Sequence, residues 1–112
     1  MSNKYTLSAD EIVPITDTPG YCYATDDITV KGKPVGYMYR ESPDRPEDSG
    51  WRFFSGLETD EEANDPDRLG IFSLNTVANY DRDIVSLLNS DFGTAFARDA
   101  SGKLVEELFS QE

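Results

Sequence analysis

The sequence contains no histidine and a single cysteine, Cys22, and these two shortages exclude several kinds of site. Histidine is the commonest general base and metal ligand at neutral pH, so Ser-His-Asp and Cys-His catalytic arrangements are excluded. One cysteine cannot form an internal disulfide, which excludes a small secreted disulfide scaffold and is typical of a reducing compartment. Without a base partner, Cys22 is expected to be a small buried hydrophobic residue and not a nucleophile.

Long apolar runs and nucleotide-binding motifs are also missing from the sequence. No stretch approaches the roughly 20 apolar residues that a membrane-spanning helix needs, and residues 1–4 do not begin a signal peptide. Neither a Walker loop nor a glycine-rich dinucleotide motif occurs. We therefore expect a soluble cytoplasmic protein that binds no cofactor and no membrane.

Positive charge is scarce, because 22 acidic side chains face only 10 basic ones and the formal net charge is −12. Residues 1–56 carry six basic and nine acidic side chains (−3), whereas residues 57–112 carry four basic and thirteen acidic ones (−9). Such a field repels nucleic acid and anionic lipid and attracts a basic partner, although acidity also aids solubility. With no basic patch among the aromatic residues, we expect no nucleic-acid binding.

The aromatic stretch at residues 48–56 predicts the central strand of a sheet. It holds the only Trp of the chain, and aromatic residues fit a pleated, half-buried surface. With a period of two, Trp51 and Phe53 face one side, while Arg52 and Phe54 face the other. Apolar groups on both faces favour a central position over an edge.

Further strands and one helix are predicted around this segment. We expect strands at 21–24, 35–40, 70–74 and 92–96, a strand or helical turn at 104–109, and a helix at 82–88. Asp81 is a good N-cap for the helix, and Gly36 permits close approach of a neighbouring strand. The fold class is therefore α+β, with a mostly antiparallel sheet and one or two short helices packed on it. Residues 1–20 form a weakly patterned N-terminal extension, and residues 21–112 a single domain of ordinary size.

An acidic run follows the central strand, since six of the ten residues from 58 to 67 are acidic. Thr59 and Glu62 have the spacing of a capping box for a short helix. Carboxylates so clustered can hold a hard cation, but the run lacks the EF-hand spacing of glycine and glutamate. We interpret it as a solvated acidic face or a partner surface. The loop at 41–49, which is long for a connection between strands, is a second place for function.

Several segments between residues 35 and 96 resemble a known family. They are GYMYRE at 36–41, DSGWRFFSG at 48–56, NTVANYD at 75–81, Leu87-Leu88 and GTAF at 93–96. Together they resemble bacterial immunity protein family thirty-three of polymorphic toxin systems, formerly a domain of unknown function. The resemblance covers about residues 21–100. It implies an α+β domain that binds and neutralises a toxin made by the same or a kindred cell, and it brings no catalytic residues.

The resemblance and the composition together predict a non-catalytic, immunity-type protein whose partner is a cognate toxin, expected to be basic. One alternative is a small-molecule or metal-binding regulatory domain that uses the loop at 41–49 and the acidic run. Another is a hydrolase with a carboxylate pair, for which adjacent acids such as Asp26-Asp27 are weak indications because acidic residues are so numerous.

The residues predicted to contact the partner flank or belong to the central strand. They are Arg40, Asp48, Trp51, Arg52, Glu58, Asp60, Glu61 and Glu62. For Trp51, a place in the core is the competing interpretation, because a Trp on a strand that is apolar on both faces is usually buried. Arg40 and Asp48 are alternatively an ion pair that holds the loop. The loop before the strand and the acidic run after it are the better candidates for the contact surface.

Overall fold

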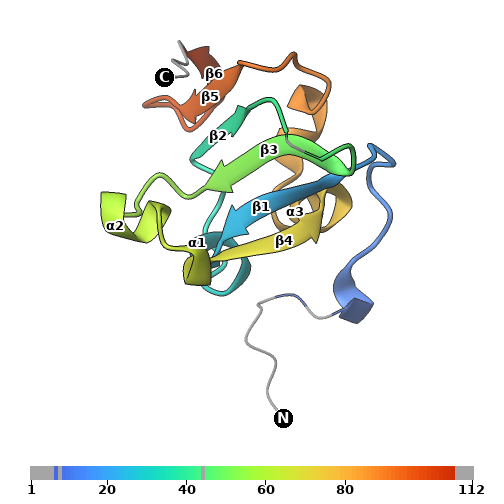
Figure 1. Cartoon of the computed structure of the whole chain (residues 1–112). Helices are drawn as coiled ribbons and strands as arrows, with labels where there is room; N and C mark the ends of the chain where they lie inside the picture. Colours follow the sequence, from blue (N-terminus) through green and yellow to red (C-terminus); the bar gives the residue numbers. More distant parts are fainter. Residues whose placement is uncertain (1–6, 8, 44, 108–112) are drawn as a thin grey trace.

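The computed structural model describes residues 7, 9–43 and 45–107, which form a six-stranded sheet with short helices (Figure 1). The strands lie in the order β4-β1-β3-β2-β5-β6. Their bounds are β1 Tyr21–Thr25, β2 Tyr37–Arg40, β3 Asp48–Phe54, β4 Leu69–Ser73, β5 Ala95–Arg98 and β6 Leu104–Glu107. Only β1 and β3 pair in parallel. The predicted α+β class with a mostly antiparallel sheet is confirmed.

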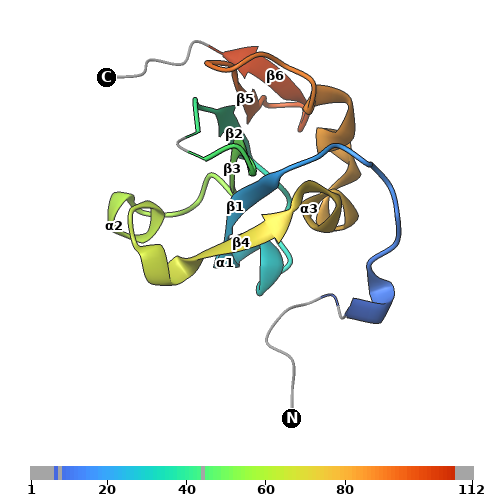
Figure 2. The same cartoon turned by 45° about the vertical axis from the view of Figure 1, so that its right-hand side comes forward.

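Short helices connect the strands. They are α1 Asp26–Thr29, α2 Asp60–Ala63 and α3 Leu74–Tyr80, with 3₁₀ turns η1 Ala9–Glu11, η2 Pro66–Arg68 and η3 Arg82–Leu87. The core joins buried residues of α1, α3 and η3, such as Ile28, Val77 and Ile84, to the inner side chains of the sheet. Figure 2 shows α3 on one side of β1 and β4 and α2 displaced to the other. Helices α1 and α3 and the turn η3 therefore cover one face of the sheet, while α2 lies beside the other face.

Strand β3 is central, as predicted, with β1 on one side and β2 on the other. Trp51 and Phe53 point into the core, where both are fully buried and their rings stack with centroids 6.0 Å apart. The indole Nε1 of Trp51 donates a hydrogen bond to the carbonyl of Leu88 at 3.1 Å, which satisfies the one polar group of the ring. Burying a side chain of this size stabilises the fold by about 1.5–3 kcal/mol or more.

The structure differs from the sequence prediction in the helical region. Residues 74–80, which were expected to lead from a strand to a helix, themselves form α3, with Ser73 accepting a hydrogen bond from the Thr76 amide at 3.1 Å as N-cap. Asp81 is an N-cap as predicted and accepts from the Asp83 amide at 3.0 Å, but the segment it caps is the 3₁₀ turn η3 and not an α-helix. Helix α3 ends at Tyr80, immediately before Asp81, and the segment that Asp81 caps is six residues long.

The final hairpin also begins later than predicted. Strand β5 starts at Ala95, because the chain still turns at residues 91–93, where Gly93 has a φ of +89°. Phe92, which was expected to share a strand face with Phe96, is instead 53 % exposed and lies outside the sheet. Residues 104–107 form a strand and not a helical turn.

The part of the N-terminal extension that the structure describes docks on α3. Asn75 and Asn79, one helical turn apart, hold its backbone with their carboxamides. The Asn75 Oδ1 accepts from the Ile15 amide at 2.7 Å, and the Asn79 Oδ1 accepts from the Val13 amide at 3.0 Å. Both carboxamides donate back to the Val13 carbonyl. Residues 9–18 are thus attached to the domain by polar contacts that a weak sequence pattern does not reveal.

Two glycines let neighbouring backbones approach closely. A Cβ on Gly36 would lie 1.9 Å from the carbonyl oxygen of Ser55, which confirms the close approach predicted there. Gly50, inside β3, has a φ of +89°, and its Cβ would lie 2.2 Å from the carbonyl oxygen of Glu41. Gly50 therefore joins the central strand to the end of β2 in a way that only glycine permits.

We expect Gly50→Ala to lower the free energy of unfolding by about 3 kcal/mol or more, because it adds a backbone clash to a strained conformation. Gly102→Ala is the matched control, since Gly102 has a similar φ of +86° but nothing within 4 Å of its would-be Cβ. This control should cost only about 1–2 kcal/mol. Chemical denaturation of both variants measures the difference, and equal losses would refute the role given to Gly50.

Candidate partner-binding surface

One face of the sheet is left without a helix over its centre, and we call it the open face. Strand alternation generates it, because Cys22, Met38 and Trp51 turn inward and their neighbours must turn outward. Its members are Tyr21, Tyr23, Tyr37, Tyr39, Arg52, Phe54, Leu69, Ile71 and Ala97. Four of the six tyrosines of the chain lie on it. Ile71 is 62 % exposed, so the face presents apolar as well as aromatic surface to solvent.

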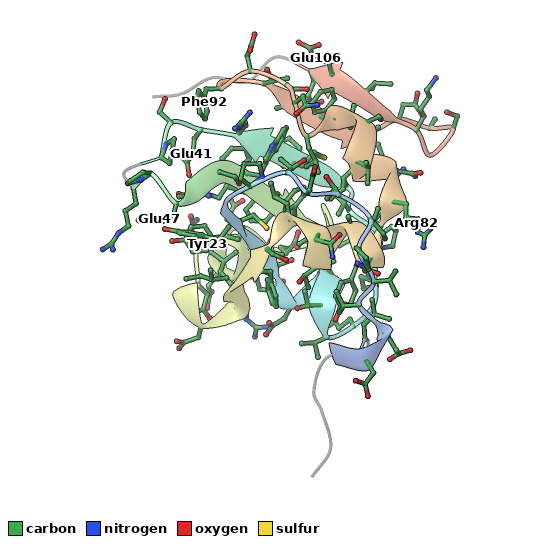
Figure 3. All side chains as sticks on the ribbon, turned by 90° about the vertical axis from the view of Figure 1, so that its right-hand side faces the viewer. Tyr23, Glu41, Glu47, Arg82, Phe92 and Glu106 are labelled. Carbon is green, nitrogen blue, oxygen red and sulfur yellow. The ribbon has the colours of Figure 1, made fainter. Side chains whose placement is uncertain are left out.

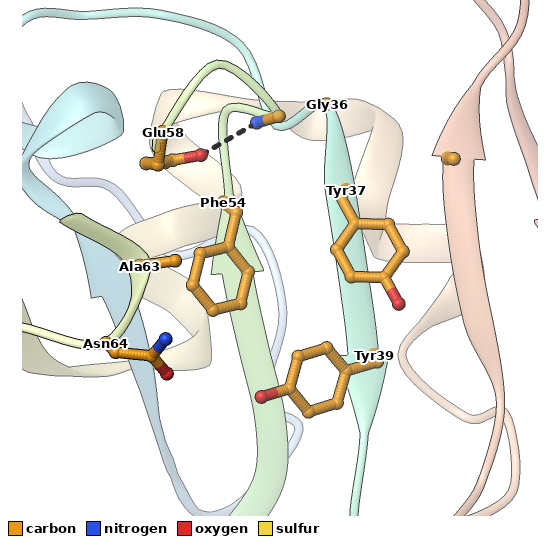
Figure 4. Close-up of a pocket in the computed structure, with 9 residues that line it drawn as sticks. Gly36, Tyr37, Tyr39, Phe54, Glu58, Ala63 and Asn64 are labelled. Atoms are coloured by element: carbon orange, nitrogen blue, oxygen red, sulfur yellow. Dashed lines mark hydrogen bonds between the residues drawn. The ribbon is translucent and has the colours of Figure 1, made fainter. Parts of the chain in front are cut away.

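A hollow of about 510 Å³ opens on this face between β2, β3 and α2. Figure 4 shows the rings of Tyr37, Tyr39 and Phe54 on their strands, with Ala63 and Asn64 beside them. The rings of Tyr39 and Phe54 are nearly parallel, with an interplanar angle of 10° and centroids 5.9 Å apart. A second hollow of about 530 Å³ adjoins it and shares four of its lining residues. The open face is therefore grooved rather than flat.

A buried ion-pair network closes the other end of the open face. Arg52 donates two hydrogen bonds to the carboxylate of Asp48, at 2.7 and 2.9 Å, and one to Glu41 at 2.8 Å. Arg52 and Asp48 are each only 8 % exposed. The hydrogen bonds from Arg52 hold the pKa of the Asp48 carboxyl below its usual range, against the opposing effect of burial. This network fixes the loop that follows β2 to the central strand.

Arg40 lies away from this network. Asp48 pairs with Arg52 and not with Arg40, so the expected ion pair between Arg40 and Asp48 is wrong. Arg40 donates instead to the carbonyls of Ser49 and Ser90, both at 2.8 Å. Its guanidinium carbon is 4.4 Å from the ring centroid of Phe92, which explains how that exposed ring is held. Arg40 therefore joins the turn before β5 to the sheet.

The acidic run at 58–67, which we call the rim, includes α2 and adjoins the hollow lined by Tyr37, Tyr39 and Phe54. Helix α2 begins with the predicted capping box, in which the Thr59 Oγ1 accepts from the Glu62 amide at 3.1 Å and Glu62 accepts from the Thr59 amide at 3.0 Å. Asp60 and Glu61, in the first turn of α2, are exposed. Asp67, which follows α2, is the other exposed acidic residue of this run.

Glu58 has a structural role in the same run. Its carboxylate accepts hydrogen bonds from the Thr25 hydroxyl at 2.6 Å and from the amides of Ser55 and Gly56 at 2.8 and 3.0 Å. Burial alone would raise the pKa of Glu58, but these hydrogen bonds hold it below its usual range. Glu58 therefore ties the end of β1 to the turn after β3.

The eight residues predicted for partner contact do not form one cluster. Trp51 is fully buried, in agreement with its interpretation as a core residue, and Arg40 lies with Phe92 at the end of β2. Asp48 and Arg52 lie under the loop after β2, and the four acidic residues lie at α2. Figure 3 shows Tyr23, Glu41 and Glu47 along one side of the molecule, with Arg82 on the opposite side.

Sequence reasoning missed the rings at the centre of the open face. Tyr37, Tyr39 and Phe54 were placed on strands, but only as strand formers. The signal was the alternation of tyrosines in two separate strands, 21–25 and 37–40, opposite buried residues. That pattern indicates a second, less buried face with its own chemistry.

The described residues 7, 9–43 and 45–107 also include a buried thiol and a third hollow. No group of three His, Cys, Asp or Glu side chains is placed to hold a metal ion, and no helix in these ranges is long and apolar enough to cross a membrane. Cys22 is fully buried, as expected, and burial raises the pKa of its thiol. A hollow of about 760 Å³ near Arg98 has four charged lining residues, and three of them pair with one another, since Arg98 binds Asp81 at 2.6 Å and Asp83 at 2.8 Å.

Comparison with known protein families identifies one match. Residues 22–107, more than half of the chain, match a family model described as the immunity protein Imm33 domain. No curated protein and no solved structure matches the chain. The matched range includes every strand of the sheet except the first residue of β1.

We expect Asp48→Asn to lower the free energy of unfolding by about 3 kcal/mol at pH 7, because it leaves the buried charge of Arg52 without its bidentate partner. The loss should shrink at acid pH. Since the folded-state pKa of Asp48 is depressed, its contribution is complete above the unfolded-state pKa of about 4 and disappears as the pH falls through the folded-state value. Urea denaturation from pH 7 to pH 2 measures both effects. The exposed Asp91→Asn is the control, and a loss for Asp48→Asn that did not vary with pH would contradict the assignment.

Proposed function

The chain belongs to the Imm33 immunity protein family, and from this premise we propose that it neutralises a protein toxin by binding it directly, without catalysis. An immunity domain implies a cognate toxin as its partner. The site of action is proposed to be the cytoplasm, in keeping with a free, buried Cys22. Neither nucleic acid nor a membrane is part of the proposed complex, because the net charge of −12 opposes both.

The observation that carries this proposal is the open face. Tyrosine is enriched among the residues that dominate binding energy at protein interfaces, because a ring buries a large area and its hydroxyl still tolerates water. Contiguous apolar surface on a soluble domain commonly marks an interaction site. Here the grooved aromatic surface continues to Ile71, which lines the second hollow and is 62 % exposed. A partner that covered this face would remove all of this surface from water.

The acidic rim gives the proposed surface its electrostatic preference. Asp60 and Glu61 are exposed residues of α2, the helix whose Ala63 lines the aromatic hollow, and the half of the chain that contains them carries −9. Toxins that act on nucleic acid are commonly basic, so an acidic rim suits a toxin of that class by charge complementarity. Of the predicted contact residues, Asp60 and Glu61 remain the proposed direct contacts. Glu58 and Glu62 are proposed to support them by shaping the turn and the helix.

The internal bonding of the buried carboxylates supports a non-catalytic role. A carboxylate pair that performs acid and base chemistry needs a shared cleft and pKa values moved apart. Asp48 instead binds Arg52, Glu58 binds backbone amides, and Asp27 accepts from the Ser55 hydroxyl at 2.8 Å. Asp48 fixes the buried Arg52 within β3, while Glu58 and Asp27 each hold two segments of the fold together. These bonds account for the placement of all three carboxylates without chemistry.

Co-expression tests the proposal. The full chain should restore growth to cells that express the toxin-like reading frame next to its gene, and the two proteins should co-purify. A catalytically inactive form of that toxin should still be retained, because binding and not turnover is proposed. Absence of both rescue and complex would overturn the proposal for that pair.

Removing charge from the rim should slow association with the toxin. We expect Asp60→Asn combined with Glu61→Gln to lower the association rate constant about tenfold at low salt and less at high salt, with little change in dissociation. The double variant Asp17→Asn with Glu106→Gln removes the same charge from exposed positions away from α2 and is the matched control. Stopped-flow binding at several ionic strengths measures the effect. Equal behaviour of the two double variants would exclude the rim from the interface.

A further inference from the structure

The rings of Tyr37, Tyr39 and Phe54, which line the hollow beside α2, are seen face-on in Figure 4. Tyr39 and Phe54 are nearly parallel, and the Tyr37 ring lies 5.9 Å from Tyr39 and 6.4 Å from Phe54 between centroids. Ala63 and Asn64 of α2 also line the hollow. The face of an aromatic ring carries negative potential, so such a hollow attracts a cation more than a neutral or negative group.

The charges around the hollow strengthen this preference. Glu58 is the one charged residue among those that line it, and Asp60 and Glu61 follow a few residues later in the chain. Burial is the main cause that raises the pKa values of Tyr37 and Tyr39. A nearby carboxylate adds to each effect, Glu107 for Tyr37 and Glu41 for Tyr39. The nearest cation on the open face, Arg52, is neutralised by Asp48 and Glu41. The net local field is therefore negative.

The chain already places its own arginines over aromatic rings, and the two shortest contacts among the described residues involve Arg52 and Arg40. The guanidinium carbon of Arg52 lies 4.5 Å from the ring centroid of Tyr23, on the same open face. That of Arg40 lies 4.4 Å from the centroid of Phe92. Both distances are within the range of about 6 Å in which a cation is attracted to a ring. Guanidinium groups therefore already lie over aromatic rings within this fold, at distances that are favourable for a cation–π contact.

We infer that the hollow formed by Tyr37, Tyr39, Phe54 and α2 is a subsite for an arginine side chain carried on a basic segment of the protein partner. A guanidinium is planar and more weakly hydrated than an ammonium, so it stacks on the ring faces better than lysine does. At about 510 Å³ the hollow also has room for the flanking residues of that segment. The inference deepens the proposed function, on which it rests for the identity of the partner.

A short arginine peptide tests the subsite without the toxin. In the full chain labelled with ¹³C at its aromatic carbons, hexa-arginine should shift the NMR signals of Tyr37, Tyr39 and Phe54. Hexalysine should shift them less at the same concentration, and hexaglutamate should leave them unchanged. Shifts confined to α2, or rings that respond equally to all three peptides, would overturn the inference. Ring signals that moved with protein concentration alone would do the same, because the face would then be a contact between two copies of the chain.

Single substitutions sharpen the test. Tyr39→Leu should weaken hexa-arginine binding about fivefold, because it removes a ring face. Tyr39→Phe should bind nearly as well as the natural chain, since it keeps the ring and loses only the hydroxyl. Phe92→Leu is the control, because Phe92 is an exposed ring that does not line this hollow. Equal affinities for Tyr39→Leu and Phe92→Leu would overturn the inference.

The toxin complex separates this inference from the proposed function. Rescue and complex formation that Tyr39→Leu leaves unchanged would overturn the arginine subsite, while direct neutralisation would stand. If hexa-arginine shifts the ring signals but no complex with the toxin forms, direct neutralisation would be overturned while the arginine subsite would stand. Both hypotheses would be supported if Tyr39→Leu weakened the toxin complex at least about fivefold. The association rate constant should then keep its dependence on ionic strength, because the acidic rim is unchanged.

Discussion

The buried pair between Arg52 and Asp48 is the interaction on which the open face depends. It lies inside β3, and its third partner, Glu41, reaches it from the end of β2. Arg52 also lies over the ring of Tyr23 from β1, so one guanidinium joins three adjacent strands. A charge in this position is stable only while its hydrogen-bonding partners remain, because desolvation of an unpaired ion costs several kcal/mol. Through Glu41 and Tyr23, Arg52 therefore links the segment after β2 and strand β1 to the central strand of the open face.

The two faces of the sheet have different roles, since one forms the core and the other forms the open face. Trp51 and Phe53 on one face are fully buried under α3 and η3, which accounts for the stability of the domain. Tyr39 and Phe54 on the other face are only partly covered and make an aromatic groove. Because consecutive residues of one strand serve the two faces, a change of register by one residue would exchange core and surface. Stability and recognition in this fold are therefore coupled through β3.

Local rules in the sequence predicted local structure well. The period of two assigned the faces of β3, Thr59 and Glu62 formed the capping box, and Gly36 marked a close approach of backbones. The failures depended on contacts between distant residues. The N-terminal segment is held by Asn75 through bonds across about sixty positions, and Arg40 binds the carbonyl of Ser90, fifty positions away, and not Asp48. Likewise, whether Tyr39 is exposed or buried depends on which face of the sheet the helices cover, and no local sequence pattern specifies which face they cover.

The position of β1 has a consequence for the order in which the fold is made. Both of its neighbours come later in the chain, since Tyr21 pairs with Asp48 of β3 on one side and with Ser73 of β4 on the other. The hairpin of β5 and β6, by contrast, closes over a short turn. Pairings between distant segments form slowly, because their loops must close before any contact is made. During synthesis, β1 therefore finds its first neighbour only when β3 has been made and its second only when β4 follows.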